Sequence, residues 1–325
     1  MDDVNPAAKT FVGRLNAFMS IIYEPKLHFA FAALWFLSLQ GNMVLQGGQG
    51  QVGEAQPWIF SIASIVGVVT LFLVMFYLRA VDEVKDLEYD KKYNPERPLV
   101  SGAVTMTDIH RYWLLGFLLI PIINLGLSPW LALFIFADML YGLLLLKLEQ
   151  WLPLMERSMM FNLLLTYPVS IALSVYTLLL TDWILGVEIQ ASSILIIISY
   201  IMAFLNFEIV RKNLWPAMAD EGEQFYSHDL GPIKAALLGL ACALGAVTLI
   251  IYLNAPWLAT GESSITGWLP LLALYPAIKS FMIFYKERTI RYNPRKWAVM
   301  FIALFYLTNL LHALTANSLA LSLFD

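Results

Sequence analysis

Three aspartates in the first half of the chain have a spacing that suits chemistry on a charged substrate. Asp82, Asp86 and Asp90 follow one another at intervals of four residues, and side chains four apart lie on one face of an α-helix. Like charges in this arrangement repel one another, so the face needs a positive partner. Mg²⁺ suits it, because this ion binds one or two carboxylates and completes its octahedron with water and substrate phosphate oxygens.

Basic side chains flank these aspartates along the segment 79–102. Arg79 lies one helical turn before the first aspartate, Lys85 lies within the acidic run, and Arg97 opens an Arg-Pro-Leu-Val-Ser-Gly turn. Arginine binds phosphate groups through two parallel hydrogen bonds. The segment therefore predicts a site for Mg²⁺ and a diphosphate. The competing interpretation is a charged helix end at the lipid headgroups, held by pairs between neighbouring side chains.

A second charged segment, 208–231, lies in the other half of the chain. Its candidate side chains are Glu208, Arg211, Lys212, Asp220 and Glu223. The acids are candidate metal ligands, and the two basic residues are candidates to bind diphosphate. A second interpretation stays open for Glu208 and Arg211, because residues three apart on a helix can form an internal ion pair.

The composition determines the kind of protein that carries these charges. Of the 325 residues, 59% are hydrophobic and only 14% are charged, against about 25% charged in soluble proteins. Neither a soluble globular fold nor a disordered chain fits these values. The net charge of −4 gives no basic field for nucleic acid. We expect an all-α polytopic membrane protein that forms a single domain over residues 1–325.

Nine apolar stretches approach the roughly 20 residues that a helix needs to cross a bilayer. They lie near 27–46, 57–81, 109–127, 129–148, 159–180, 191–210, 232–254, 265–285 and 297–321. Lys and Arg occur at the N-terminus and in or beside the connections after spans two, four, six and eight, and the other connections lack them. The positive-inside rule then predicts a cytoplasmic N-terminus and a C-terminus on the opposite side. Residues 1–24 carry apolar side chains at helical spacing and predict a short interfacial helix.

The first charged segment resembles the first signature of the UbiA superfamily of intramembrane prenyltransferases. That signature usually reads Asn-Asp-x-x-Asp-x-x-x-Asp, followed by Arg-Pro-Leu-x-Ser-Gly. Here Asp82 replaces the usual Asn and Glu83 replaces the usual Asp, whereas Asp86, Asp90 and the turn from Arg97 match. The family also has nine transmembrane helices, with its acidic motifs after helices two and six. The resemblance implies a UbiA-like bundle around a central cavity and adds Glu83 to the metal ligands.

Elsewhere the resemblance is looser. The second segment holds Leu214 and Met218 where the family usually has aspartates, which is typical of a divergent branch. Tyr141 and Lys147 resemble the family's diphosphate-contacting Tyr and Lys/Arg, although Lys147 also fits a lysine that extends from a helix end to the membrane surface. Asp138 lies inside the fourth span, where an acid usually faces a cavity or a partner, and its role stays open.

The resemblance implies an enzyme that transfers an isoprenyl group from a prenyl diphosphate to a lipophilic acceptor, most often an aromatic one. Mg²⁺ is its cofactor, Asp82, Asp86, Asp90 and Lys147 are its catalytic candidates, and the enzyme lies in a bacterial-type cytoplasmic membrane in contact with lipid. Two alternatives are a UbiA-type terpene cyclase, which needs no acceptor, and a transporter. The transporter predicts paired broken helices and an internal repeat, and neither is evident in the sequence.

Overall fold

The computed structural model describes residues 10–48, 57–187, 189–219, 223–288 and 294–322. Within these residues, nine helical segments are long and apolar enough to cross a membrane, which confirms the predicted number of spans. They are Pro25–Gly47, Ile62–Lys85, Met106–Leu125, Pro129–Trp151, Met159–Leu185, Ala191–Arg211, Pro232–Asn254, Glu262–Lys286 and Arg295–Ala316. The chain packs as two compact units, each built from two separate stretches, and the units are described in turn.

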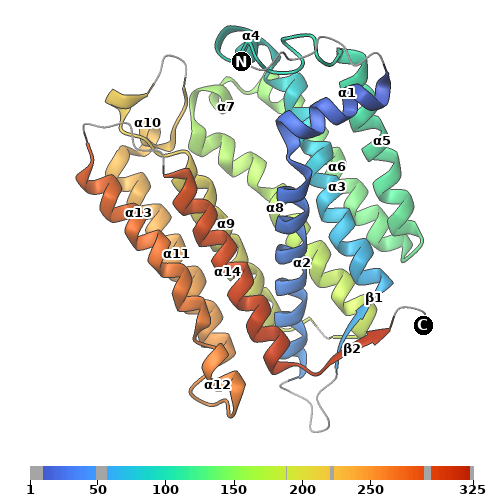
Figure 1. Cartoon of the computed structure of the whole chain (residues 1–325), viewed down its shortest axis with the longest axis vertical. Coiled ribbons are helices and arrows are strands. Elements are labelled where there is room, and N and C mark those ends of the chain that lie inside the picture. Colours follow the sequence, from blue (N-terminus) through green and yellow to red (C-terminus); the bar gives the residue numbers. More distant parts are fainter. Residues whose placement is uncertain (1–9, 49–56, 188, 220–222, 289–293, 323–325) are drawn as a thin grey trace. The chain divides into compact units, whose positions relative to one another are not determined.

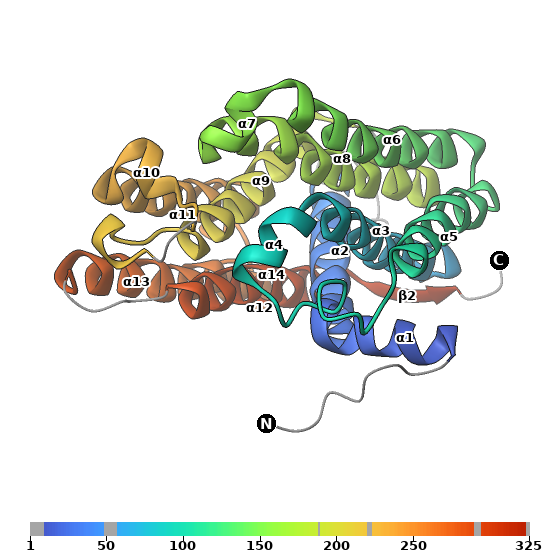
Figure 2. The same ribbon diagram turned by 90° about the horizontal axis from the view of Figure 1, so that it is seen from above.

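Unit 1 contains residues 1–33 and 66–151. Its complete helices are α1 (Phe11–Phe18), the π-helical turn η1 (Met19–Tyr23), α4 (Leu87–Tyr93), α5 (Met106–Leu125) and α6 (Pro129–Trp151). The unit also holds the start of α2 (Pro25–Gly48) and all but the first residues of α3 (Ile62–Lys85). Helices α5 and α6 lie side by side (Figures 1 and 2).

Helices α3 and α6 approach each other closely inside unit 1. A Cβ placed on Gly142 would lie 2.9 Å from Cδ2 of Leu78, so glycine lets the two helices pack closely here and a larger residue would require the end of the Leu78 side chain to move. One turn earlier on α6, the hydroxyl of Tyr77 donates a hydrogen bond of 3.0 Å to the carbonyl of Met139. The contacts advance along both helices in the same direction, as two even-numbered spans should.

Unit 2 contains residues 34–65 and 152–325. Its helices are α7 (Pro153–Arg157), α8 (Met159–Leu185), α9 (Ala191–Arg211), η2 (Pro216–Met218), α10 (Tyr226–Leu230), α11 (Pro232–Asn254), α12 (Glu262–Thr266), η3 (Leu269–Ala273), α13 (Leu274–Lys286) and α14 (Arg295–Ala316). Helices α9 and α11 form its most extensive contact (Figure 2). A Cβ on Gly239 of α11 would lie 2.7 Å from the side chain of Val210, so glycine again lets the two helices pack closely.

Several span boundaries differ from the sequence-based expectation, and three of the differences have an identifiable local cause. The eighth span is divided into α12, η3 and α13, because Pro270 lacks the N–H that a continuous helix requires at that position. The second span begins at Ile62 because Trp58–Ser61 forms a strand, β1, and the ninth ends at Ala316 before β2 (Leu319–Ser322). These two strands pair in parallel in unit 2 (Figure 1). Within the residues that the structure describes, the fold is all-α apart from this short pair.

Candidate functional site

The first acidic run lies where α3 continues into α4. Backbone hydrogen bonds of 2.8 Å run from Asp86 N to Asp82 O and from Asp90 N to Asp86 O, so the i, i+4 pattern passes through the junction between the helices. The sequence predicted the three aspartates on one face of a single helix; the hydrogen bonds keep the spacing of four, but the helix is divided at Asp86, which lies between α3 and α4. Their surroundings differ, because Asp90 is buried while the other two are half-buried.

Glu83 is the buried centre of an arginine cluster. Its Oε1 accepts a hydrogen bond of 2.6 Å from Arg79 Nη2 and one of 3.0 Å from Arg97 Nη1, and the residue is only 2% exposed. The predicted metal ligand Glu83 therefore has two guanidinium partners. The same contacts bring Arg79 and Arg97 together, as the sequence predicts for a diphosphate site.

Asp90 holds the same cluster from the opposite side of the turn. Its Oδ1 accepts a hydrogen bond of 2.7 Å from Asn94 Nδ2, and its Oδ2 lies 3.8 Å from Arg97 Nε. Glu83 and Asp90 thus fix the orientation of Arg97 from two directions. Sequence reasoning did not single out Asn94, although an amide four residues after an acid on a helix is a signal for this pairing.

Asp82 and Asp86 are the acids that best fit Mg²⁺. Asp86 is half-buried, and burial together with the charge of Asp82 raises its pKa above the usual value. Its side chain makes no ion pair or hydrogen bond within the part of the chain that the structure describes. The described residues contain no cluster of three or more metal-ligating side chains. Two carboxylates fit Mg²⁺ nevertheless, since this ion keeps several waters or phosphate oxygens.

A residue that the sequence did not reveal, Glu149, extends the site to α6. Its Oε2 lies 3.3 Å from Nζ of Lys85. Lys147 is two residues away from Glu149, which places it on another face of α6, and it is exposed. The structure does not bring Lys147 to the arginine cluster within unit 1, so its predicted catalytic role has no geometric support there.

Tyr141 and Asp138 lie deeper along α6 than Glu149. Tyr141 is half-buried, and Asp138 is 7% exposed with no hydrogen-bond partner for Oδ2 in the described structure. Asp138 lies within electrostatic range of both Tyr141 and Tyr77, so the three side chains are near one another inside unit 1. A buried acid of this kind fits the expectation that an acid inside a span faces a cavity or a partner.

The second charged segment forms a closed cluster in unit 2 at the end of α9. Arg211 Nε donates a hydrogen bond of 2.7 Å to Glu208 Oε2, and Lys212 Nζ lies 3.4 Å from Glu208 Oε1. The hydroxyl of Tyr226 donates to the same Oε1 at 3.3 Å. Three donors therefore converge on Glu208, which supports the internal ion pair rather than a metal ligand for this residue.

Two other acids complete the account of this segment. Asp220 lies outside the described residues, and Glu223 is half-buried. Asp229, which sequence reasoning passed over, accepts hydrogen bonds from Ser158 Oγ at 2.9 Å and Met160 N at 2.7 Å. It thereby fastens α10 to the first turn of α8, and an acid at a helix N-terminus is favoured by the helix dipole.

Replacing Tyr226 by Phe tests the closed cluster. Tyr226 is buried, and burial and the charge of Glu208 raise its pKa well above the usual value, so its hydroxyl is a neutral donor. Removing one hydrogen bond to a carboxylate should lower the free energy of unfolding by about 1.5 kcal/mol. Thermal unfolding in detergent measures the change. Tyr252→Phe, at an exposed tyrosine of α11, should unfold as the wild type does, and equal midpoints for both variants would refute the cluster.

Comparison with known structures places this arrangement in a known fold. The structure of a digeranylgeranylglyceryl phosphate synthase aligns with a TM-score of 0.61 and 13% identity, over 93% of this chain and 99% of that one. A UbiA homolog from Aeropyrum pernix K1 aligns with a TM-score of 0.51 and 14% identity, over 88% and 97% of the two chains. The chain has the UbiA fold. No family model and no curated protein matches its sequence.

The two charged segments occupy comparable places in the order of the spans. They follow the second and sixth spans of the chain, as the sequence resemblance to the superfamily implies. At 13–14% identity, the likeness supports the predicted fold. The chemistry has to be argued from the individual side chains.

Proposed function

We propose that this protein is an intramembrane prenyltransferase that moves an isoprenyl group from a prenyl diphosphate to a lipophilic acceptor. The observation that carries the proposal is the pair of arginines held by Glu83 beside Asp82 and Asp86. The fold supports it, since one solved neighbour is a synthase of digeranylgeranylglyceryl phosphate, whose name contains isoprenyl groups. The positive-inside rule puts this site and the N-terminus on the cytoplasmic side.

The basic side chains would bind the diphosphate. Arg79 and Arg97 each direct one terminal nitrogen at Glu83, and a guanidinium has five N–H donors, so both keep donors for phosphate oxygens. Lys85 adds a third positive charge beside Asp82 and Asp86. Glu83 and Asp90 would orient the arginines, because neither guanidinium can turn without losing a carboxylate partner.

Asp82 and Asp86 would hold Mg²⁺. Once bound, the ion would supply positive charge to the oxygens of the leaving diphosphate. The C–O bond to diphosphate breaks with its electrons on the diphosphate, and the allylic carbon then bonds to the nucleophilic atom of the acceptor, which loses a proton. The apolar helices would keep water away from the cation. Arg211 and Lys212 share the single carboxylate of Glu208, so this group keeps a net positive charge and both residues remain candidates to bind diphosphate.

Product analysis tests the proposal directly. Purified protein in lipid nanodiscs should release diphosphate from one of a panel of prenyl diphosphates when Mg²⁺ and a lipophilic aromatic acceptor are present. Mass spectrometry should then find the acceptor heavier by one isoprenyl group. A cyclised hydrocarbon or alcohol formed without acceptor would replace the transferase by a terpene cyclase, and absence of diphosphate release across the panel would reject both.

A further inference from the structure

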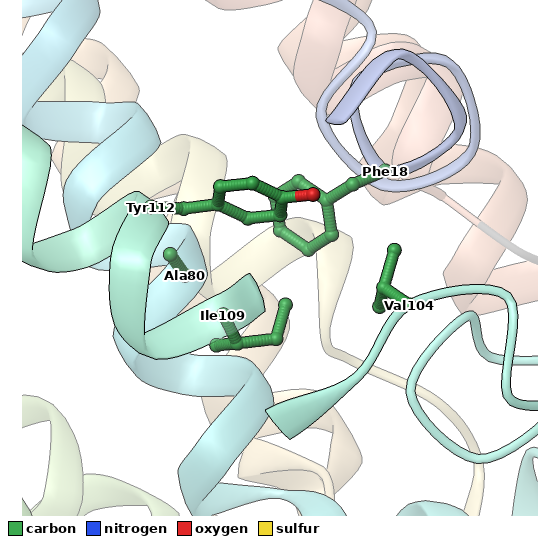
Figure 3. Close-up of a cluster of buried hydrophobic side chains, with 5 residues drawn as sticks. All are labelled: Phe18, Ala80, Val104, Ile109 and Tyr112. Carbon is green, nitrogen blue, oxygen red and sulfur yellow. The ribbon is translucent and has the colours of Figure 1, made fainter. Parts of the chain in front are cut away.

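A helical segment at the N-terminus, residues 10–24, packs onto the loop that carries Arg97. We call this segment, which comprises α1 and η1 with one flanking residue on each side, the N-terminal strap. Its Phe18 is fully buried against Ala80, Val104, Ile109 and Tyr112 (Figure 3). The ring centroids of Phe18 and Tyr112 are 5.5 Å apart. The apolar face that the sequence assigned to the membrane surface is thus packed against protein.

A part-buried ion pair connects the strap to the start of α5. Arg14 Nε donates to Asp108 Oδ2 at 2.6 Å, and Arg14 Nη2 donates to Asp108 Oδ1 at 2.9 Å. Asp108 is 1% exposed and also accepts hydrogen bonds from the backbone and hydroxyl of Thr105, at 3.0 and 2.6 Å. One carboxylate therefore holds both the strap and the N-terminal cap of α5.

The loop between Arg97 and Thr105 is fixed by the same cluster. Leu99 and Val104 pack against the buried residues around Phe18. Inside the loop, Val104 N donates to Pro98 O at 3.1 Å, so the two ends of the loop are hydrogen-bonded to each other. Arg97 at one end is bound to Glu83, and Thr105 at the other end is bound to Asp108. The strap therefore controls the far end of the loop.

We propose that the N-terminal strap positions Arg97 for diphosphate binding, with Arg14 and Phe18 as its positioning residues. The inference rests on the proposed function for its ligand, a diphosphate. The reason is that Arg97 is the first residue of the eight-residue loop 97–104. Contacts from the strap order that loop. Loss of Arg14 leaves Asp108 buried without its cationic partner and releases the loop from the strap.

The test compares Arg14→Ala with Arg111→Ala, a control at an exposed arginine of α5 three residues after Asp108. Titration of the full-length protein with inorganic pyrophosphate and Mg²⁺ should show about tenfold weaker binding for Arg14→Ala and no change for the control. Amide hydrogen exchange in residues 98–104 should be faster in Arg14→Ala alone. Unchanged pyrophosphate affinity in folded Arg14→Ala would overturn the inference, as would an equal loss in the control.

A second variant covers the case in which Arg14→Ala does not fold. Arg14→Lys keeps the positive charge beside Asp108 but cannot make two parallel hydrogen bonds, so we expect about threefold weaker pyrophosphate binding. Wild-type pyrophosphate affinity together with wild-type hydrogen exchange in the loop after Arg97 in Arg14→Lys would overturn the inference. Failure of the wild-type protein to bind pyrophosphate would instead reject the proposed function, and hydrogen exchange in residues 98–104 would then show only a structural role for the strap.

Discussion

Replacing Asp86 by Asn should lower the rate of Mg²⁺-dependent diphosphate release by a factor of about 100 to 1,000. The carboxylate of Asp86 is half-buried beside Asp82, and the charge of that neighbour contributes to its raised pKa. Two carboxylates this close gain by sharing a divalent cation, and an amide in place of one of them removes half of the negative charge. The measurement is diphosphate release at saturating prenyl diphosphate over a range of Mg²⁺ concentrations.

The Mg²⁺ dependence makes this result specific. A variant that has lost a metal ligand should need more Mg²⁺ for half of its maximal rate, whereas a variant that is merely unstable should not. Glu96→Gln is the matched control, because Glu96 is an exposed acid on the same connection. We expect it to retain the wild-type rate and Mg²⁺ dependence. Full diphosphate release by Asp86→Asn would show that the acidic run does not hold the metal.

The sequence was sufficient for the features that depend on local periodicity and on the distribution of charge. Nine apolar helices are present in the described residues, and the helical path from Asp82 to Asp90 persists across the junction of α3 and α4. Both follow from rules that act over a few residues, namely the length of an apolar run and the spacing of four. The strands β1 and β2 were not predicted, because they pair residues that are far apart in the chain.

The partners of individual charges could not be predicted in the same way. Lys85 pairs with Glu149, and Arg14 pairs with Asp108, across long sequence separations that only tertiary packing sets. For Glu208 the sequence left a metal ligand and an internal ion pair open, and the structure supplies Arg211, Lys212 and Tyr226 as donors. Whether an acid pairs with a basic side chain or binds a metal ion depends on which residues pack against it in the folded protein.

Replacing Glu83 by Gln should lower the free energy of unfolding by about 3 kcal/mol, because it removes one partner of a buried ion pair. Glu83 is 2% exposed and accepts from two guanidinium groups, whose side chains are only 25% and 29% exposed. The amide can still accept a hydrogen bond, but it leaves two positive charges side by side without a counter-charge between them. Equilibrium unfolding in mixed detergent micelles measures the loss.

The same variant distinguishes an arginine partner from a metal ligand, the role that the sequence resemblance implies for Glu83. If Glu83 is an arginine partner, Glu83→Gln should be less stable than the wild type in metal-free protein with a chelator present, because Arg79 and Arg97 are part of the fold. If Glu83 is a metal ligand, the variant should be about as stable as the wild type without metal, and Mg²⁺ should stabilise it less than it stabilises the wild type. Glu88→Gln is the control, because Glu88 pairs with Lys91 at the same 2.6 Å but is 83% exposed, and such pairs contribute little. Equal stability of Glu83→Gln and wild type in chelator would contradict the arginine cluster as the organising element of the site.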